Sequence, residues 1–144
     1  ARYKAQVIEK DEKETKGIRT LLNFGHTYAH ALESSLKYHG IGHGEAVGMG
    51  MIFAAFLSYC LGFCSMETVK RIHSLCAAYG LLRREQLDPD VLYEKMIHDK
   101  KFISGRIRMV LVRDVGDVFV HETITERALK SALVKYIAVI DKWV

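Results

Sequence analysis

A run without charge, residues 46–66, constrains the fold of this 144-residue chain more than any other feature. A run of this length can form a helix that crosses the hydrocarbon core of a bilayer. The central helix of a large globular domain has the same appearance, because it is apolar on every side. Glycine and serine dilute the hydrophobicity of the run, and Gly48, Gly50, Ala54 and Ala55 would let neighbouring backbones approach a buried helix closely. Composition alone does not separate the two structures.

The stretch before this run, residues 19–37, has the pattern of one amphipathic helix. At about 100° per residue, Arg19, Asn23, His26 and His30 fall on a single face. Glu33 and Lys37 continue this polar strip, and the opposite side carries Leu21, Phe24, Tyr28, Leu32 and Leu36. A polar strip is usually a solvated surface, but such a surface normally consists of Lys and Glu. Histidine, asparagine and arginine fit a binding or catalytic site better.

Histidines give this strip its chemistry. His26 and His30 lie one turn apart and can both reach one ion, and neutral imidazole is a good ligand for zinc or a similar transition metal. A third imidazole, His43, follows a Gly-Ile-Gly break, where a second helix is expected to begin. Spacing therefore predicts a metal site with His26 and His30 as the first pair, and a solvated face remains the alternative.

Three segments in this region, LNFGHT, AHALE and HGEAVGMGM, resemble the signature of the 3-dehydroquinate synthase family, part of the wider group of sugar phosphate cyclases. The similarity runs from about Lys4 to the end of the chain and corresponds to the C-terminal domain of a two-domain enzyme. It implies one domain over residues 1–144, mainly α, a multi-helix bundle with a small two-stranded β element. The resemblance also implies an N-terminal nucleotide-binding domain that is absent from this chain. With this resemblance, the uncharged run is expected to be a core helix and not a membrane span.

The resemblance also assigns roles to individual residues near the histidines. It implies that His26 and His43 bind the metal, together with a glutamate from the N-terminal domain, and that His30 is a general acid or base. This replaces the pairing of His26 with His30 that spacing suggests. Asn23 would bind substrate, and Arg19 suits a carboxylate or phosphate because its planar guanidinium can bind bidentately.

Further site residues follow from the resemblance at the two ends of the domain. Lys4, in YKAQVIE, matches a substrate-binding lysine. Glu14 matches an acidic active-site residue, with Glu12 as the alternative because this chain carries one extra residue, Lys16, between that acid and the arginine. In the DKK run, one of Lys100 and Lys101, with Lys101 preferred, would contact the anionic end of the substrate. No residue of this chain is assigned to the nucleotide cofactor.

The activity implied by the resemblance is that of a phosphate-eliminating lyase. The family uses NAD and one divalent metal, zinc or another such as Co2+, to convert 3-deoxy-D-arabino-heptulosonate 7-phosphate to 3-dehydroquinate and phosphate, in the shikimate pathway of aromatic amino acid biosynthesis. The chain has no G-x-G-x-x-G fingerprint, so we expect activity only with the N-terminal domain. The alternatives are another sugar phosphate cyclase, such as one similar to 2-deoxy-scyllo-inosose synthase, and a non-catalytic helical binding module.

Charge and cysteine content add expectations about partners and location. The net charge is +4, but Lys and Arg alternate with Asp and Glu, which gives no stripe for nucleic acid. Cys60, Cys64 and Cys76 lack C-x-x-C spacing and are expected to be reduced core thiols of a cytoplasmic protein. No signal-peptide pattern is visible. The expected partners are a sugar acid phosphate, the N-terminal domain and, from the family, a second copy in a homodimer, without nucleic acid or membrane.

The remaining segments predict ordinary structural elements. The first is a charged helix over residues 2–14, and the second is a helix capped by Ser65 and ended by Gly80. A short helix follows residues 87–90, with Val91, Leu92, Met96 and Ile97 toward the core. Strands over 106–113 and 118–121 come next, and the last helix has Leu129, Leu133, Tyr136 and Ile137 on one stripe. Thr123 to Glu126 has the pattern of a capping box for this last helix.

Overall fold

A computed structural model describes residue 5 and residues 18–37, 40–99 and 106–143. In these ranges the elements are the 3-10 helix η1 (Ile18–Asn23), α2 (His26–Ser35), α3 (His43–Cys60), α4 (Met66–Ala78), α5 (Pro89–Asp99), β1 (Arg106–Asp114), β2 (Asp117–Thr125) and α6 (Glu126–Trp143). The two strands form an antiparallel hairpin. The predicted fold class, a helical bundle with a small two-stranded sheet, is confirmed.

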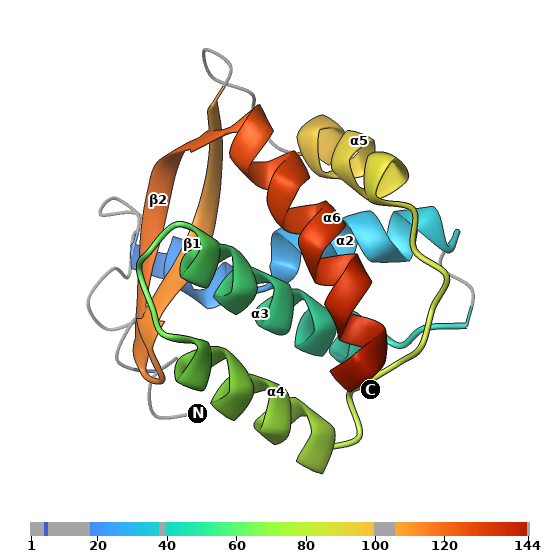
Figure 1. Cartoon of the computed structure of the whole chain (residues 1–144), viewed down its shortest axis with the longest axis horizontal. Helices are drawn as coiled ribbons and strands as arrows, with labels where there is room; N and C mark the ends of the chain where they lie inside the picture. The colour runs from blue at the N-terminus through green and yellow to red at the C-terminus, as the bar shows by residue number, and fades with distance from the viewer. Residues whose placement is uncertain (1–4, 6–17, 38–39, 100–105, 144) are drawn as a thin grey trace.

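Helix α3 lies in the middle of the domain (Figure 1). In Figure 1, α6 crosses in front of it, α4 runs below it, and the hairpin lies at one side. Most of α3 between Ala46 and Ser58 is buried, and Phe53 and Leu57 have no exposed surface. The uncharged run is therefore a core helix followed by a turn, because α3 ends at Cys60 and Gly62, with φ +83°, reverses the chain before α4. Over the described ranges, no helix is both long and apolar enough to span a membrane.

An aromatic cluster joins three helices at the centre of the core. Tyr28 of α2 stacks on Phe53 of α3 with ring centroids 4.8 Å apart, and Tyr136 of α6 meets the Phe53 ring edge-on at 5.3 Å. The Tyr136 hydroxyl donates to the carbonyl oxygen of Met49 at 3.3 Å. The Tyr28 hydroxyl is also buried but has no hydrogen-bond partner among the residues described. Burial raises the pKa of both phenols.

One buried hydroxyl attaches the hairpin to α3. Ser58 donates to the carbonyl oxygen of Ala54 at 2.6 Å and accepts the backbone N–H of Val112, in β1, at 3.0 Å. Ser58 has no exposed surface. The hydroxyl thus satisfies a buried backbone donor that the hairpin would otherwise leave unpaired.

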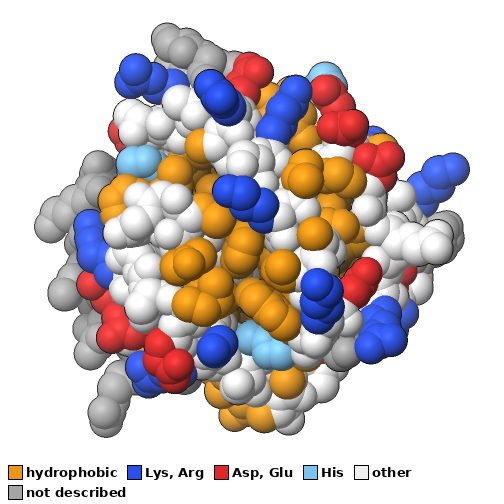
Figure 2. All heavy atoms as spheres, in the orientation of Figure 1, with side chains coloured by type: hydrophobic (Ala, Val, Ile, Leu, Met, Phe, Trp, Pro, Cys, Tyr) orange, Lys and Arg blue, Asp and Glu red, His pale blue; other side chains and the backbone are white. Residues whose placement is uncertain are grey.

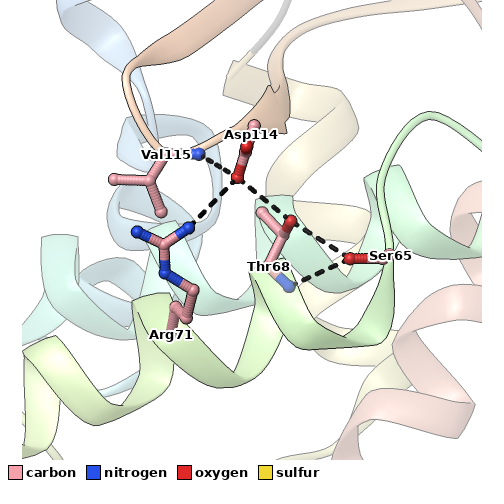
Figure 3. A network of polar contacts seen from close by, with 5 residues as sticks. All are labelled: Ser65, Thr68, Arg71, Asp114 and Val115. Atoms are coloured by element: carbon pink, nitrogen blue, oxygen red, sulfur yellow. Dashed lines mark hydrogen bonds and ion pairs between the residues drawn. The ribbon is translucent and has the colours of Figure 1, made fainter.

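A second polar network attaches the turn of the hairpin to the start of α4 (Figure 3). The Asp114 carboxylate accepts the backbone N–H of Val115 at 2.8 Å and the Thr68 hydroxyl at 3.3 Å, and it lies 3.5 Å from the Arg71 guanidinium. Ser65 accepts the backbone N–H of Thr68 at 3.3 Å, which confirms Ser65 as the N-cap of α4. The hairpin turn and the helix cap therefore share one set of hydrogen bonds.

The space-filling view in Figure 2 has the orientation of Figure 1. Hydrophobic side chains cross the middle of this face, where α3 and α6 lie in Figure 1, and side chains of both charges surround them. On this face, therefore, side chains of both charges are present around the hydrophobic middle.

Several predicted details are wrong. Residues 19–37 do not form one helix: η1 ends at Asn23, Gly25 takes a left-handed φ of +85°, and α2 begins at His26. The cap of α6 is Thr125 and not Thr123, because β2 continues to Thr125, whose hydroxyl accepts the N–H of Ala128 at 3.2 Å.

Two exposures also differ from the sequence predictions. Val91 is 43% exposed, although Leu92 and Met96 on the same helix are buried. Cys60 is exposed at the end of α3, whereas Cys76 is buried as predicted. The predicted helix over residues 2–14 lies outside the described residues, apart from helical residue 5.

Candidate active site

The backbones of α2 and α3 cross at two glycines. A Cβ atom on Gly50 would lie 2.0 Å from the carbonyl oxygen of Gly25 and 3.2 Å from the backbone nitrogen of Ala29. A Cβ on Gly25 would lie 2.7 Å from the backbone nitrogen of Met51. This contact leaves no room for a side chain at either glycine. Gly25 also has a positive φ, which glycine adopts without strain, so that the chain can turn at this contact. The crossing holds the start of α2 directly against α3.

The crossing places three imidazoles in one cluster. His26 is the first residue of α2, His30 lies one turn further along, and His43 is the first residue of α3. The ring centroid of His26 is 5.9 Å from that of His30 and 5.7 Å from that of His43. His26 is thus the middle member of a group drawn from two helices.

The His43 and His26 rings each have an oxygen atom near Nδ1. The His43 Nδ1 lies 2.8 Å from the Glu33 carboxylate, and the His26 Nδ1 lies 3.3 Å from the carbonyl oxygen of Phe24. The His43 side chain is 61% exposed, whereas that of Glu33 is 11% exposed. The cluster therefore has one side open to solvent, where a ligand can enter, and a carboxylate beneath it.

Charged contacts hold the loop that leads into α3. Glu45 accepts the backbone N–H of Gly42 at 2.7 Å, and its other oxygen lies 3.5 Å from the Arg83 guanidinium. Arg83 also donates to the carbonyl oxygen of Gly40. These bonds fix the backbone on both sides of the Gly-Ile-Gly break and so fix the position at which His43 begins the helix.

The cluster fits one part of a metal centre. Among the described residues, no three His, Cys, Asp or Glu side chains are grouped as ligands of one ion. His26 and His43 offer two nitrogen donors from different helices, whereas catalytic zinc is usually held by three protein ligands. A metal bound here needs a further ligand from elsewhere, and imidazole nitrogen is a suitable donor for zinc or cobalt.

The other predicted site residues are placed less completely. Asn23 is exposed at the end of η1, and the turn at Gly25 separates η1 from the helix that begins at His26. The side chain of Arg19 lies outside what the structure describes. The same holds for Lys4, Glu12, Glu14, Lys100 and Lys101, whose assignments stay predictions.

Sequence reasoning missed two residues that shape the site. The sequence pattern places Glu33 only on the polar strip, yet the residue is buried and hydrogen-bonded to His43. Its position seven residues after His26 on the same helical face was the available signal. Arg83 gave no signal in the sequence, because its partners Glu45 and Gly40 are far away along the chain.

Sequence comparison finds 3-dehydroquinate synthases among the related proteins. A family model described as 3-dehydroquinate synthase C-terminal matches residues 1–102. A 3-dehydroquinate synthase from Endomicrobium trichonymphae is 42% identical over 132 residues, covering 90% of this chain and 37% of the relative. One from Dehalococcoides mccartyi is 44% identical over 134 residues, covering 92% of this chain and 37% of the relative. The chain therefore spans a little over a third of the length of these curated relatives.

Structure comparison finds sugar phosphate cyclases. A 2-deoxy-scyllo-inosose synthase, solved with carbaglucose-6-phosphate, NAD+ and Co2+, matches with a TM-score of 0.69 and 26% identity over 78% of this chain and 32% of that one. A 2-epi-5-epi-valiolone synthase from Streptomyces hygroscopicus subsp. jinggangensis, solved with NAD+ and Zn2+, has a TM-score of 0.76 at 23% identity and covers 94% of this chain and 37% of its own. The second match shows likeness of fold alone.

Proposed function

The chain belongs to the 3-dehydroquinate synthase C-terminal family, and on that premise we propose that residues 1–144 are the metal- and substrate-binding domain of a 3-dehydroquinate synthase. The complete enzyme would convert 3-deoxy-D-arabino-heptulosonate 7-phosphate to 3-dehydroquinate and phosphate with NAD and a divalent metal, zinc or cobalt. An N-terminal domain would supply the NAD site and the missing metal ligand. We further propose a cytoplasmic homodimer.

One observation carries this proposal: His26 and His43, from separate helices, have ring centroids 5.7 Å apart. Two neutral imidazoles at this separation can share one divalent cation. The close crossing of Gly25 and Gly50 holds the backbone before His26 directly against α3, because a Cβ on either glycine would clash with the opposite backbone. A solvated polar face would not require such a constraint.

The chain's own residues would divide the work. His26 and His43 would hold the metal, which when bound polarises a substrate oxygen as a Lewis acid. His30, one turn from His26, would take up or give back a proton within hydrogen-bonding reach of the substrate. Arg19 would bind the carboxylate or phosphate bidentately, and Asn23 would hydrogen-bond a hydroxyl. Lys4, Glu14 or Glu12, and Lys100 or Lys101 complete the proposed substrate site.

A second candidate substrate comes from the structural relatives. The match to a 2-deoxy-scyllo-inosose synthase bound to carbaglucose-6-phosphate favours a cyclase of glucose 6-phosphate, which would use the same metal histidines. Sequence identity to the 3-dehydroquinate synthases is higher, at 42% and 44% against 26%. We therefore rank the heptulosonate phosphate first.

The test uses the complete protein, in which this chain is joined to its N-terminal domain. Phosphate release is measured with the heptulosonate 7-phosphate, glucose 6-phosphate and sedoheptulose 7-phosphate, each with and without NAD and metal. Of the three substrates, we expect only the heptulosonate 7-phosphate to be turned over. Turnover should stop after treatment with a chelator, and residues 1–144 by themselves should show no turnover. H26A and H43A should lose both metal and activity while retaining the helical circular dichroism spectrum. Full metal content and activity in both variants would show that the domain is not the metal-binding part of a cyclase.

A further inference from the structure

The two proposed metal ligands share one feature that spacing does not predict: each has its Nδ1 atom at an oxygen of α2 or of the residues just before it. His43 Nδ1 lies 2.8 Å from the Glu33 carboxylate. His26 Nδ1 lies 3.3 Å from the carbonyl oxygen of Phe24. A carboxylate and a carbonyl only accept hydrogen bonds, so both contacts favour the tautomer with hydrogen on Nδ1 and a free lone pair on Nε2.

We propose that Glu33 is a positioning residue for the metal site. Its carboxylate accepts the Nδ1 hydrogen of His43, which orients the imidazole and leaves Nε2 to bind the same cation as His26. The carbonyl oxygen of Phe24 does the same for His26. This inference rests on the proposed function, because it presupposes that these two histidines bind a metal.

Burial distinguishes Glu33 from an ordinary surface acid. Glu33 is 9% exposed, and its partner His43 has a side chain that is 61% exposed. An exposed imidazole at the first position of a helix rotates freely unless another group holds it, and metal binding then costs the entropy of ordering the ring. A fixed hydrogen-bond acceptor orders the ring before the metal binds. A nearby carboxylate also makes the imidazole a more basic ligand.

The backbone of His43 is already fixed from the other side. Arg83 donates to Gly40 and pairs with Glu45, and Glu45 accepts the N–H of Gly42. The freedom that remains at His43 is therefore in its side chain, whose Nδ1 lies 2.8 Å from the Glu33 carboxylate. Glu33 and His26 both belong to α2. The hydrogen bond to Glu33 therefore also fixes the position of the His43 ring relative to the helix that carries His26, the other proposed ligand.

A second Glu–His pair in the domain serves as an internal control. Glu94 and His98, both on α5, are 3.9 Å apart, with side chains 61% and 81% exposed. Exposed pairs one turn apart on a helix contribute little. The residue types match those of Glu33 and His43, but burial, distance and location differ.

The experiment measures Zn2+ and Co2+ affinity in the complete protein by competition with a chromogenic chelator, for wild type, E33L, E33Q, H26A, H43A and E94L. E33L keeps side-chain bulk and removes the acceptor, so we expect affinity to fall by roughly 10–100-fold. In E33Q the amide oxygen still accepts the hydrogen bond from His43, and we expect metal affinity to fall by about tenfold, near the lower end of that range. E94L should bind like wild type. If E33L fails to fold, the near-isosteric E33Q decides.

A direct readout separates positioning from structural support. In the metal-free protein, above the pH at which imidazole titrates, long-range 1H–15N correlations should report hydrogen on Nδ1 of His43 in wild type. In E33L the Nε2–H tautomer of His43 should gain population, while His98 should be unchanged in every Glu33 variant. A purely structural role for Glu33 would alter thermal stability without moving this tautomer.

The outcomes distinguish this inference from the proposed function. Wild-type metal affinity in E33L and E33Q, with loss in H26A and H43A, would overturn the positioning role and leave the metal site intact. Wild-type affinity in H26A and H43A as well would overturn both. Loss in all four variants, with E94L unaffected and the tautomer shift present, is the result that the geometry predicts.

Discussion

The two ends of α3 are built in different ways. At its N-terminal end, His43 is exposed and is held by side-chain contacts to Glu33, with Arg83 and Glu45 fixing the backbone nearby. At its C-terminal end, Ser58 is fully buried and bonds to backbone atoms of α3 and β1. One helix therefore has an exposed end that carries a histidine and a buried end that supports the fold. Substitutions at each end should therefore change different properties.

Gly50 lies between the two ends, and G50A should lower both stability and metal affinity. The new Cβ would lie 2.0 Å from a backbone oxygen of Gly25, which cannot move as a flexible side chain can. We expect a loss of about 3 kcal/mol in the free energy of unfolding, the upper part of the usual overpacking range, together with weaker metal binding as the imidazoles separate. Urea denaturation and chelator competition measure the two effects. G44A, where a Cβ meets nothing within 4 Å, is the matched control. A stable G50A protein with wild-type affinity would contradict the crossing.

At the C-terminal end, S58A should lower stability alone. The substitution leaves the buried N–H of Val112 without an acceptor, and a buried unsatisfied donor costs about 1–3 kcal/mol. Metal affinity should stay at the wild-type value because His43 is at the other end of the helix. S74A, on the exposed face of α4, should change neither property. A fall in affinity for S58A without a fall in stability would reverse the assignment of the two ends.

The tyrosines of the core offer a smaller test with opposite signs. Y136F removes a hydrogen bond to Met49 and should lower stability by about 1 kcal/mol. Y28F removes a buried hydroxyl that has no partner among the described residues, and should raise stability by about 1 kcal/mol. Denaturation at pH 7 measures both. Equal losses in the two variants would mean that the Tyr28 hydroxyl is satisfied.

These tyrosines also predict how stability changes with pH. Burial raises the pKa of Tyr28 and Tyr136 above their usual range. The stabilisation from a buried neutral phenol is fully present below the unfolded pKa, about 10, and is lost as pH rises toward the folded pKa. Alkaline unfolding should therefore begin above the unfolded pKa, and Y28F should shift it to higher pH. An unchanged alkaline midpoint in Y28F would show that Tyr28 does not contribute.

The hairpin network in Figure 3 should have the smallest effect. The Asp114 and Arg71 side chains are 63% and 56% exposed, and exposed ion pairs contribute about 0–1 kcal/mol. D114N retains an acceptor for Val115 and Thr68, so it should cost less than D114A. Thermal denaturation compares the two. A loss above that of S58A would mean that the turn contributes more than the buried hydroxyl.

The sequence predicts much of this fold because several helix ends and the hairpin are determined by residues close together in the chain. The start of α3 at His43, the Ser65 cap and the hairpin all depend on residues close together in the chain. The single helix over residues 19–37 was wrong because periodicity does not register a contact with a distant helix: Gly25 turns the chain to fit against Gly50.

The candidate site was predicted only in part for the same reason. The resemblance identified His26 and His43 as a pair, and their rings do lie together in space. Glu33 and Arg83 were missed, because their value lies in burial and in partners far along the chain. Such roles are set by tertiary packing, which residue spacing does not encode.

X-ray absorption spectroscopy of the zinc- or cobalt-loaded complete protein shows whether His26 and His43 bind the same cation. We expect two imidazole nitrogens at about 2.0–2.1 Å from the metal, with H26A and H43A each removing one. An absorption spectrum without imidazole ligands, or one unchanged in both variants, would mean that the two histidines do not bind the cation.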